Sequence, residues 1–205
     1  MKGILFIISS PSGGGKGTLI REVLKTVPRV GYSVSFTTRA PRTGERHGHE
    51  YYFVSPSEFE KMRADGAFLE WAQVHNHFYG TARAQIEIEL GAGRDVILEI
   101  DVQGAKNVKN LAPESVGIFI MPPSFEILSQ RLEERGSENS TDLAIRLLNA
   151  RGEVEHYREF DYLIVNDEIP RAAAQLAAVF LAERARRARM ETMIQNILKT
   201  FSLSD

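Results

Sequence analysis

Ser10-Pro-Ser-Gly-Gly-Gly-Lys-Gly-Thr18 is a glycine-rich stretch between two apolar stretches. It follows the apolar run Ile4–Ile8, typical of a buried strand, and precedes Leu19–Thr26, whose apolar spacing predicts a helix. In this setting the glycines let backbone N–H groups turn toward an anion, the helix N-terminus adds positive potential, and Lys16 supplies a cation. The stretch therefore predicts a loop that binds the phosphates of a nucleoside triphosphate.

The loop departs from the G-x-x-x-x-G-K-[ST] pattern at two positions. Ser10 replaces the first glycine, and Gly17 replaces the hydroxyl residue that binds Mg²⁺, with Thr18 one position later. The alternative is an ordinary glycine-rich turn, which would leave Lys16 at the helix start unexplained. We therefore assign the triphosphate to Ser10, Pro11, Ser12, Gly13, Gly14, Gly15, Lys16, Gly17 and Thr18.

The composition indicates one ordinary domain with room for inserted lobes. The chain has 205 residues, 43% of them hydrophobic, and a net charge of −2, which does not favour polyanion binding. It has no cysteine, which excludes disulfides and Cys-ligated zinc. Its first apolar run is too short for a signal peptide, and no stretch is long enough to span a membrane. We expect a cytoplasmic protein that binds neither nucleic acid nor membrane.

Alternating strands and helices predict an α/β fold, with a P-loop NTPase-type parallel sheet flanked by helices. After Ile4–Ile8, the apolar runs that predict strands are Val96–Ile100, Val116–Met121 and Tyr162–Val165. After Leu19–Thr26, the helical patterns cover Gln103–Leu111, Phe125–Glu134, Thr141–Arg158 and Arg171–Arg189. We interpret residues 1–32 and 95–205 as this P-loop core.

Three further segments lie outside this alternation. Residues 33–94 predict an inserted α+β lobe, because their strand-like stretches are polar and alternating; these are Tyr32–Thr38, Tyr51–Val54 and Phe68–Val74. A short polar segment, about residues 135–142, predicts a lid between two helices. The tail, about residues 190–205, has apolar side chains at helical spacing, so we expect it to pack on its own chain or on a second subunit.

A pair of arginines in the lobe is suited to an anion. Arg39 and Arg42 stand three residues apart across Pro41, and paired guanidiniums hold a phosphate bidentately. A solvated basic loop is an equally good interpretation of this pair alone. Tyr51 and Tyr79 would add hydroxyl donors to the same anion.

The chain also resembles a known family. The run Ser-x-Thr-Thr-Arg-x-Pro-Arg-x-Gly-Glu from Ser35 to Glu45, followed by Tyr51–Val54, is similar to the nucleotide-acceptor lobe of guanylate kinases. The likeness continues at Phe68 to Ala72, Tyr79 to Thr81, Asp101 to Gly104, the lid frame from Arg131 to Arg146, and Ile164 to Asp167. It covers nearly the whole chain in the family's order.

The resemblance implies transfer of a phosphoryl group from ATP to GMP, with dGMP as a further acceptor and Mg²⁺ as cofactor. It makes residues 33–94 a GMP-binding lobe. It places Ser35, Glu70, Thr81 and Asp101 around guanine, and Arg39, Arg42, Tyr51 and Tyr79 on the GMP phosphate. It also implies that Arg131, Arg135 and Arg146 close over the transferring group with Lys16, and that Asn166 lies near adenine.

The chemistry of guanine agrees with a carboxylate at Glu70. Guanine offers N1–H and N2–H₂ side by side, and one carboxylate accepts both, which adenine cannot match. Ser35 and Thr81 would donate to O6 or bind water. Taken alone, Glu70 would be an exposed residue of an alternating strand.

Glu99 and Asp101 stand two residues apart near the end of a predicted strand, so they face the same side. The carboxyl end of such a strand is where parallel sheets bind ligands. One carboxylate would organise Mg²⁺ and its waters while the other faces the base, and two carboxylates that cap the next helix are the alternative. Because Gly17 has no hydroxyl, Mg²⁺ would be held by ATP oxygens and water, with Thr18, Glu99 and Asp101 as candidate ligands.

Other polar clusters have simpler interpretations. We interpret His47, His49, His75 and His77 as solvated loop histidines rather than metal ligands. The arginines Arg184, Arg186, Arg187 and Arg189 fit an exposed helix end better than a nucleic-acid site. The rival functions are a phosphopeptide-binding module, against which Lys16 and the glycines argue, and a ribosyl phosphate kinase, against which Glu70 and Ser35 argue.

Overall fold

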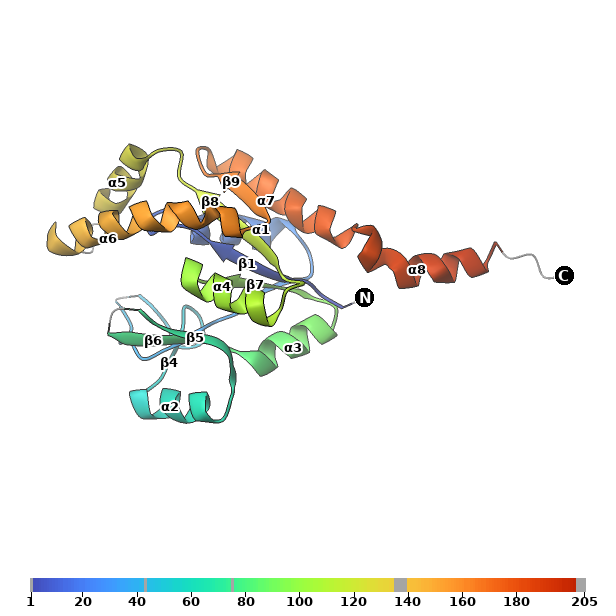
Figure 1. Ribbon diagram of the computed structural model, residues 1–205, viewed down its shortest axis with the longest axis horizontal. Coiled ribbons are helices and arrows are strands. Elements are labelled where there is room, and N and C mark those ends of the chain that lie inside the picture. Colours follow the sequence, from blue (N-terminus) through green and yellow to red (C-terminus); the bar gives the residue numbers. More distant parts are fainter. Residues whose placement is uncertain (1, 43, 75, 135–139, 202–205) are drawn as a thin grey trace.

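A parallel sheet of five strands forms the centre of the molecule (Figure 1). The computed structural model describes residues 2–42, 44–74, 76–134 and 140–201. The strand order is β2-β7-β1-β8-β9, and every neighbouring pair is parallel. The strands are β1 (Leu5–Ser9), β2 (Val30–Tyr32), β7 (Asp95–Glu99), β8 (Val116–Met121) and β9 (Tyr162–Val165). The predicted α/β class and the parallel core sheet are confirmed.

Helices cover both faces of this sheet. Phe6 and Ile8 of β1 lie in one cluster with α1 (Lys16–Thr26) and α7 (Ile169–Arg184), and the Phe6 and Phe180 rings stack with centroids 3.8 Å apart. Leu5 and Ile7 lie in the opposite cluster with α3 (Arg83–Gly91) and α4 (Val102–Leu111). Because both faces are buried, the central strands have continuous apolar sequences rather than alternating ones.

The chain passes from the parallel sheet to a second sheet between Tyr32 and Phe36. The single strand expected over Tyr32–Thr38 is wrong, because Tyr32 ends β2 in the parallel sheet whereas β3 (Phe36–Thr37) belongs to a second sheet. Sequence patterning also missed β2 itself. Its three residues include Gly31, and only pairing with β7 holds them extended.

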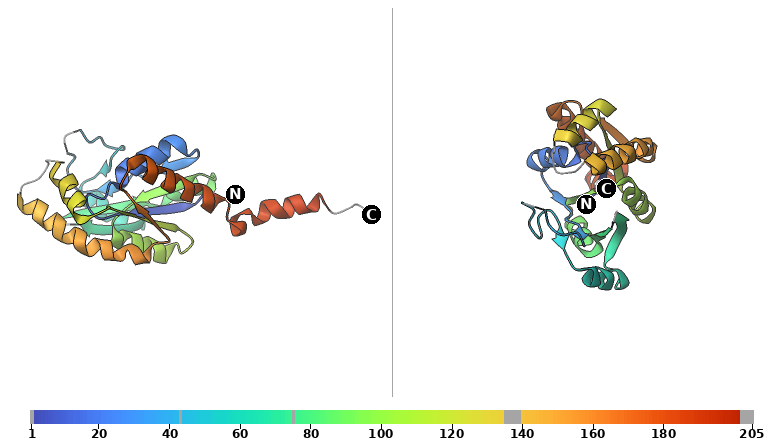
Figure 2. Two further views of the ribbon diagram at one scale, coloured as in Figure 1. Left: turned by 90° about the horizontal axis from the view of Figure 1, so that it is seen from above. Right: turned by 90° about the vertical axis from the view of Figure 1, so that its left-hand side faces the viewer.

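The second sheet has the order β4-β3-β6-β5 and lies below the core in Figure 1 and in the right-hand view of Figure 2. Its other strands are β4 (Tyr52–Phe53), β5 (Phe68–Val74) and β6 (His77–Ala82). Helix α2 (Pro56–Ala64) packs Phe59 on Phe68 and Phe78, with ring centroids 4.6 and 5.5 Å apart. The second sheet therefore has an aromatic core of its own, while the lobe boundaries 33–94 stay a prediction.

Two long helical predictions are wrong at their C-terminal ends. The helix expected over Thr141–Arg158 is α6 (Ser140–Glu153) followed by the 3₁₀ helix η1 (Val154–Glu159). The helix expected over Arg171–Arg189 ends at Arg184, and α8 (Arg187–Lys199) begins after a break. Helix α5 (Phe125–Glu134) has its predicted bounds. Residues 135–139 of the expected lid lie outside the described residues.

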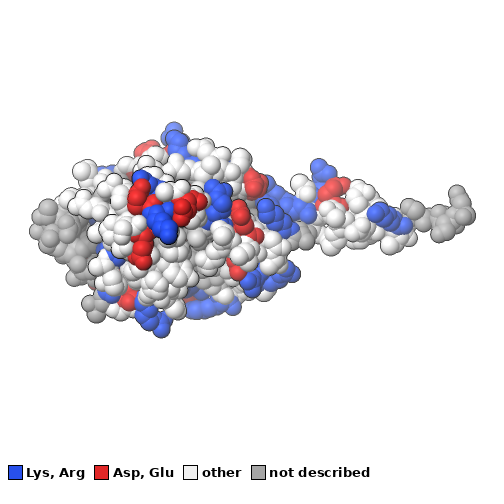
Figure 3. Space-filling model, turned by 90° about the horizontal axis from the view of Figure 1, so that it is seen from below, with Lys and Arg blue, Asp and Glu red and all other residues white. Residues whose placement is uncertain are grey.

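Helix α8 extends from the body as an arm (Figures 1 and 2). None of its residues is buried, and its exposed apolar side chains are Met193, Ile194, Ile197 and Leu198, followed by Phe201. The expectation that the tail packs on its own chain is therefore not met. Figure 3 shows the same arm beside a face of the body on which acidic and basic side chains are intermingled. Among the described helices, none has the length and apolar character needed to cross a membrane.

Candidate nucleotide site

The glycine-rich loop joins the central strand β1 to α1. Gly13 and Gly15 have φ angles of 84° and 89°, in the left-handed region that favours glycine. A Cβ on Gly15 would also collide with the Asn166 side chain. The loop therefore needs glycine at residue 15 for both its backbone angle and its close packing.

Lys16 lies over the start of this loop. Its Nζ donates to the carbonyl oxygen and to Oγ of Ser10, at 3.4 and 3.3 Å. Ser10 is buried, and its Oγ lies 2.8 Å from where a Cβ of Gly14 would stand. The serine that replaces the first glycine of the pattern is therefore a packing and hydrogen-bonding partner within the loop.

Asn166 directly follows the edge strand β9 and joins the loop to this edge of the sheet. It is buried, and its side-chain Nδ2 donates to the backbone carbonyl of Gly14 at 2.9 Å. The backbone carbonyl of Asn166 accepts from Nη2 of Arg131 in α5, also at 2.9 Å. Arg131 is thus brought beside the loop. Arg146 lies on α6, and Arg135 falls outside the described residues.

Glu153 is a loop contact that sequence reasoning missed. This residue ends α6, and its Oε2 accepts a hydrogen bond from the backbone N–H of Ser12 at 3.0 Å. The two residues are 141 positions apart in the chain. No local motif marks Glu153, because only the packing of α6 brings it to the loop.

A second group of polar side chains lies where the lobe sheet meets α4. Thr81 of β6 donates to Glu70 of β5 at 2.7 Å, and both side chains are buried. Asp101 caps α4 by accepting from the Gly104 N–H at 2.7 Å. Burial raises the pKa of Glu70 to about 7, the hydrogen bond from Thr81 opposes this, and the nearby Asp101 carboxylate adds to it. The hydrogen bond from Gly104 shows that Asp101 caps the next helix, as the alternative interpretation of this residue predicted.

The arginines and tyrosines of the lobe are only partly brought together. Arg39 lies over the Tyr51 ring, 5.4 Å from its centroid, and the Tyr51 and Tyr79 rings are 5.8 Å apart. Arg42 is exposed; its backbone N–H donates to the Glu45 carboxylate at 2.8 Å, and its carbonyl accepts from the Glu45 N–H at 3.0 Å. Ser35 is half-buried and directly precedes β3. Its backbone carbonyl accepts a hydrogen bond from the N–H of Tyr52, the first residue of β4.

Glu45 is a second residue that the sequence reasoning left without a role. Both of its carboxylate oxygens accept from Nη2 of Arg39 at 2.9 Å. Burial lowers the pKa of Arg39, but the hydrogen bond and charge of Glu45 outweigh that effect and leave the pKa raised. Glu45 therefore orients the guanidinium that the sequence assigned to a phosphate.

Glu99 lies between the loop and the lobe. It ends β7, and a Cβ on Gly17 would be 3.9 Å from each of its carboxylate oxygens. Burial raises the pKa of Tyr51 to about 12, and the next contribution comes from the Glu99 carboxylate. Glu99 therefore lies beside the loop, and its charge acts on the Tyr51 hydroxyl of the lobe.

The arginines near the end of α7 form ion pairs within the protein, and the histidines do not gather into a metal site among the described residues. Arg184 bonds Asp95 at 2.8 Å, and Arg186 approaches buried Glu183 at 3.2 Å. His47 Nδ1 accepts from the Phe53 N–H at 3.2 Å, and His75 lies outside the described residues. Throughout the described part of the chain, no three His, Cys, Asp or Glu side chains form a group that could hold a metal ion.

A glycine-rich loop between the central strand of a parallel sheet and the following helix defines the class of P-loop nucleotide-binding proteins. The guanylate kinase family model matches residues 2–183. The chain belongs to the guanylate kinase family.

Individual relatives agree with this membership. A guanylate kinase of Dechloromonas aromatica is 48% identical over 202 residues, which are 95% of this chain and 100% of that protein. A guanylate kinase of Xanthomonas oryzae pv. oryzae is 46% identical over 187 residues, covering 91% and 92% of the two chains. The crystal structure of guanylate kinase from Anaplasma phagocytophilum superimposes with a TM-score of 0.81 at 32% identity, covering 99% of this chain and 97% of that one.

Proposed function

We propose that this protein is an ATP:GMP phosphotransferase, which moves the γ-phosphoryl group of ATP to GMP and forms ADP and GDP. The observation that carries this proposal is the position of Glu99, beside Gly17 of the loop and close enough to Tyr51 to raise its pKa. The proposed ATP-binding loop and the proposed GMP-binding lobe therefore lie next to each other. Family membership favours this function over a phosphopeptide-binding module or a ribosyl phosphate kinase.

The loop is the proposed ATP site. Backbone N–H groups of residues 12–18 and the Lys16 ammonium would hold the phosphates, with Asn166 on the adenine side. The left-handed conformations of Gly13 and Gly15 support this role, because they let successive N–H groups converge.

The second sheet is the proposed GMP site. Arg39, Arg42, Tyr51 and Tyr79 would hold the phosphate, and Ser35, Glu70, Thr81 and Asp101 would surround the base. Thr81 binds one oxygen of Glu70, which supports a role for this carboxylate in accepting guanine N1–H and N2–H₂. Membership of the guanylate kinase family supports dGMP as a further proposed acceptor.

The transfer needs no side-chain base. The nucleophile is a phosphate oxygen of GMP, which is largely deprotonated at neutral pH because its second pKa is about 6. The protein would align the two nucleotides and neutralise their charge with Lys16 and the lid arginines Arg131, Arg135 and Arg146. Closure of the lid would also exclude water, which would otherwise hydrolyse ATP.

The residues beside the loop fit Mg²⁺ bound to a nucleotide rather than an all-protein metal cage. Within the described residues no group of three ligands is available, whereas Glu99, Thr18 and Asp101 provide oxygens near the loop or the lobe. Mg²⁺ prefers a few carboxylate oxygens with phosphates and water. Bound there, it would neutralise phosphate charge.

We also propose that the α8 arm joins two copies of the chain, because its apolar side chains are uncovered. We also propose the cytoplasmic location that the sequence predicts. Cell fractionation would test this location.

An assay of ADP formation tests the proposed reaction. With ATP, we expect turnover with GMP and dGMP, and little with AMP, dTMP or a ribosyl phosphate. Lys16→Met should lower kcat by about 10²–10³, since it removes one preorganised positive charge. Equal turnover with all acceptors, or an unimpaired Lys16→Met variant, would contradict the proposal.

A further inference from the structure

The phosphate loop contacts α5 and α6 through two consecutive residues. The Ser12 N–H donates to Oε2 of Glu153, the last residue of α6, at 3.0 Å. Gly13 lies against α5, because a Cβ at this position would stand 2.9 Å from Cγ of Leu132. Leu132 in turn shares a buried cluster with Ala150 of α6. The loop and the two helices therefore form one packed unit at the C-terminal end of β1.

Glu153 makes the polar contact of this unit. A carboxylate accepts a hydrogen bond more strongly than a neutral oxygen does, so this bond is among the stronger ones available to a backbone N–H. Directly after Glu153 the chain changes from the α-helix α6 to the 3₁₀ helix η1. The bond therefore fixes the C-terminal end of α6 on the loop.

The same helix carries Arg146, one of the arginines proposed to neutralise the transferring group. Arg146 precedes Glu153 by seven residues, which is about two helical turns, so the two lie on one face of α6. Between them, Leu147 and the fully buried Ala150 pack against α5. Because Arg146 and Glu153 share a face, the bond from Ser12 also sets the rotation of α6 that presents Arg146.

We propose that Glu153 is a positioning residue for the transfer. Its carboxylate holds α6 on the phosphate loop and thereby keeps Arg146 at the phosphates that the loop binds, without itself touching a nucleotide. The bond occupies the Ser12 N–H, so the donors left for phosphate begin at Gly13. This proposal rests on the proposed ATP-dependent transfer.

Single variants of Glu153 test the proposal through kcat and nucleotide affinity. In Glu153→Ala, kcat with ATP and GMP should fall about 10- to 100-fold, because a displaced arginine no longer meets the developing charge. The Kd for ADP, measured by calorimetry, should change little, since the other loop donors remain. Glu153→Gln keeps an oxygen acceptor for the Ser12 N–H and should retain most of the kcat.

A double-mutant cycle separates action through Arg146 from a general loss of structure. Arg146→Ala should lower kcat by itself. Adding Glu153→Ala to that variant should lower kcat little further, because the arginine that Glu153 positions is already gone.

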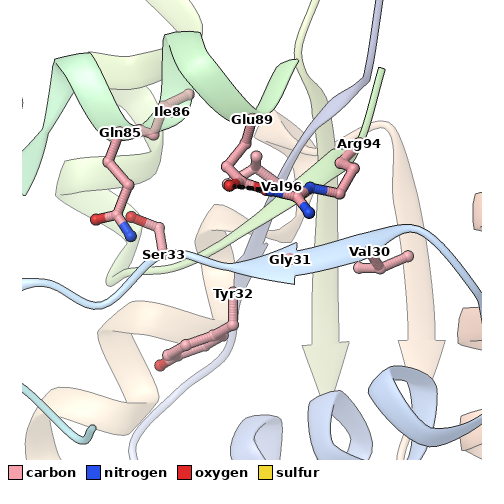
Figure 4. A pocket seen from close by; sticks show the side chains of 9 residues that line it. All are labelled: Val30, Gly31, Tyr32, Ser33, Gln85, Ile86, Glu89, Arg94 and Val96. Carbon is pink, nitrogen blue, oxygen red and sulfur yellow. Dashed lines mark hydrogen bonds and ion pairs between the residues drawn. The ribbon is translucent and has the colours of Figure 1, made fainter. Parts of the chain in front are cut away.

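Glu89→Ala is the matched control. Glu89 is also a carboxylate in the last turn of a helix, α3, and it pairs with Arg94 at 2.6 Å beside a cavity of about 310 Å³ (Figure 4). Arg94 directly precedes β7, whereas the phosphate loop follows β1. Because these strands are parallel, the pair and the loop lie at opposite edges of the sheet. The control should lose stability in urea and keep its kcat.

Hydrogen exchange provides a measurement that needs no turnover. Peptides that span residues 12–18 should exchange faster in Glu153→Ala than in the unmodified protein, and at the unmodified rate in Glu89→Ala. Unchanged exchange or unchanged kcat in Glu153→Ala would overturn the proposal, as would fully additive losses of kcat with Arg146→Ala. Failure of the unmodified protein to phosphorylate GMP would instead contradict the proposed function.

Discussion

Glu70 has two opposing requirements. Only 7% of it is exposed, and burial raises its pKa to about 7, yet in the proposed role it would have to be ionised to accept both guanine donors. The Thr81 hydroxyl stabilises the charged form in the free protein. Two donors from guanine would stabilise it further, so base binding and ionisation are coupled at this residue.

Base choice should depend on this carboxylate. In Glu70→Gln only the amide oxygen can accept, so we expect kcat/KM with GMP to fall about 10- to 100-fold, the worth of a hydrogen bond to a charged group. Turnover with AMP should change little, and the GMP:AMP ratio measures the effect. An unchanged ratio would show that Glu70 does not recognise guanine.

The same substitution should change how stability depends on pH. The folded-state pKa of Glu70 lies above its ordinary value of 4.5, so between pH 4.5 and 7 the folded protein binds more protons than the unfolded chain. This contribution to stability is present below pH 4.5 and is lost as pH rises through 7. The variant lacks this titrating group. Its free energy of unfolding, relative to that of the unmodified protein, should therefore rise by on the order of 3 kcal/mol as the pH increases from 4.5 to 7.

Urea unfolding of both proteins at pH 4.5, 6 and 8 measures this difference. Subtracting one protein from the other cancels the other titrating groups. A constant difference across the range would mean that the Glu70 carboxyl titrates normally.

The segment that joins β3 to β4 holds its two arginines differently. Arg39 is fixed by Glu45 and by the Tyr51 ring, whereas Arg42 has an exposed side chain. We expect Arg39→Lys and Arg42→Lys each to raise KM for GMP, because an ammonium cannot form the planar fork. ATP binding without GMP should change little in either variant.

Stability should distinguish the same two variants. Arg39→Lys breaks a charge-assisted pair within the loop and should lower the free energy of unfolding by about 1 kcal/mol. Arg42→Lys should leave it unchanged. Chemical denaturation measures the difference, and equal losses would show that Glu45 does not hold this segment.

The α8 arm bears on whether the whole molecule associates with a second copy. An isolated helix of its length is marginal in water, so a covered apolar face would stabilise it. If two arms meet, removal of residues 187–205 should abolish self-association in sedimentation equilibrium while kcat per chain remains unchanged. The double variant Ile194→Ser with Ile197→Ser should weaken association without shortening the chain. A monomeric full-length protein would contradict the proposed dimer.

The sequence by itself determined the class of the fold, the phosphate loop and the family. These features depend on neighbours in the chain: the apolar runs that became β1, β7, β8 and β9, and the glycines around Lys16. Bounds were predicted well for β8, β9 and α5, where apolar patterns end at polar or proline residues. Local chemistry is sufficient for such elements.

Only the tertiary structure decided which distant groups meet. It added β2 as a sheet edge, placed Glu153 on the loop and Tyr32 on Glu99, and gave Asp101 a capping role that Glu99 does not share. It also left α8 uncovered. Short strands and long-range hydrogen bonds owe their stability to partners far away in the chain, so no local pattern specifies them.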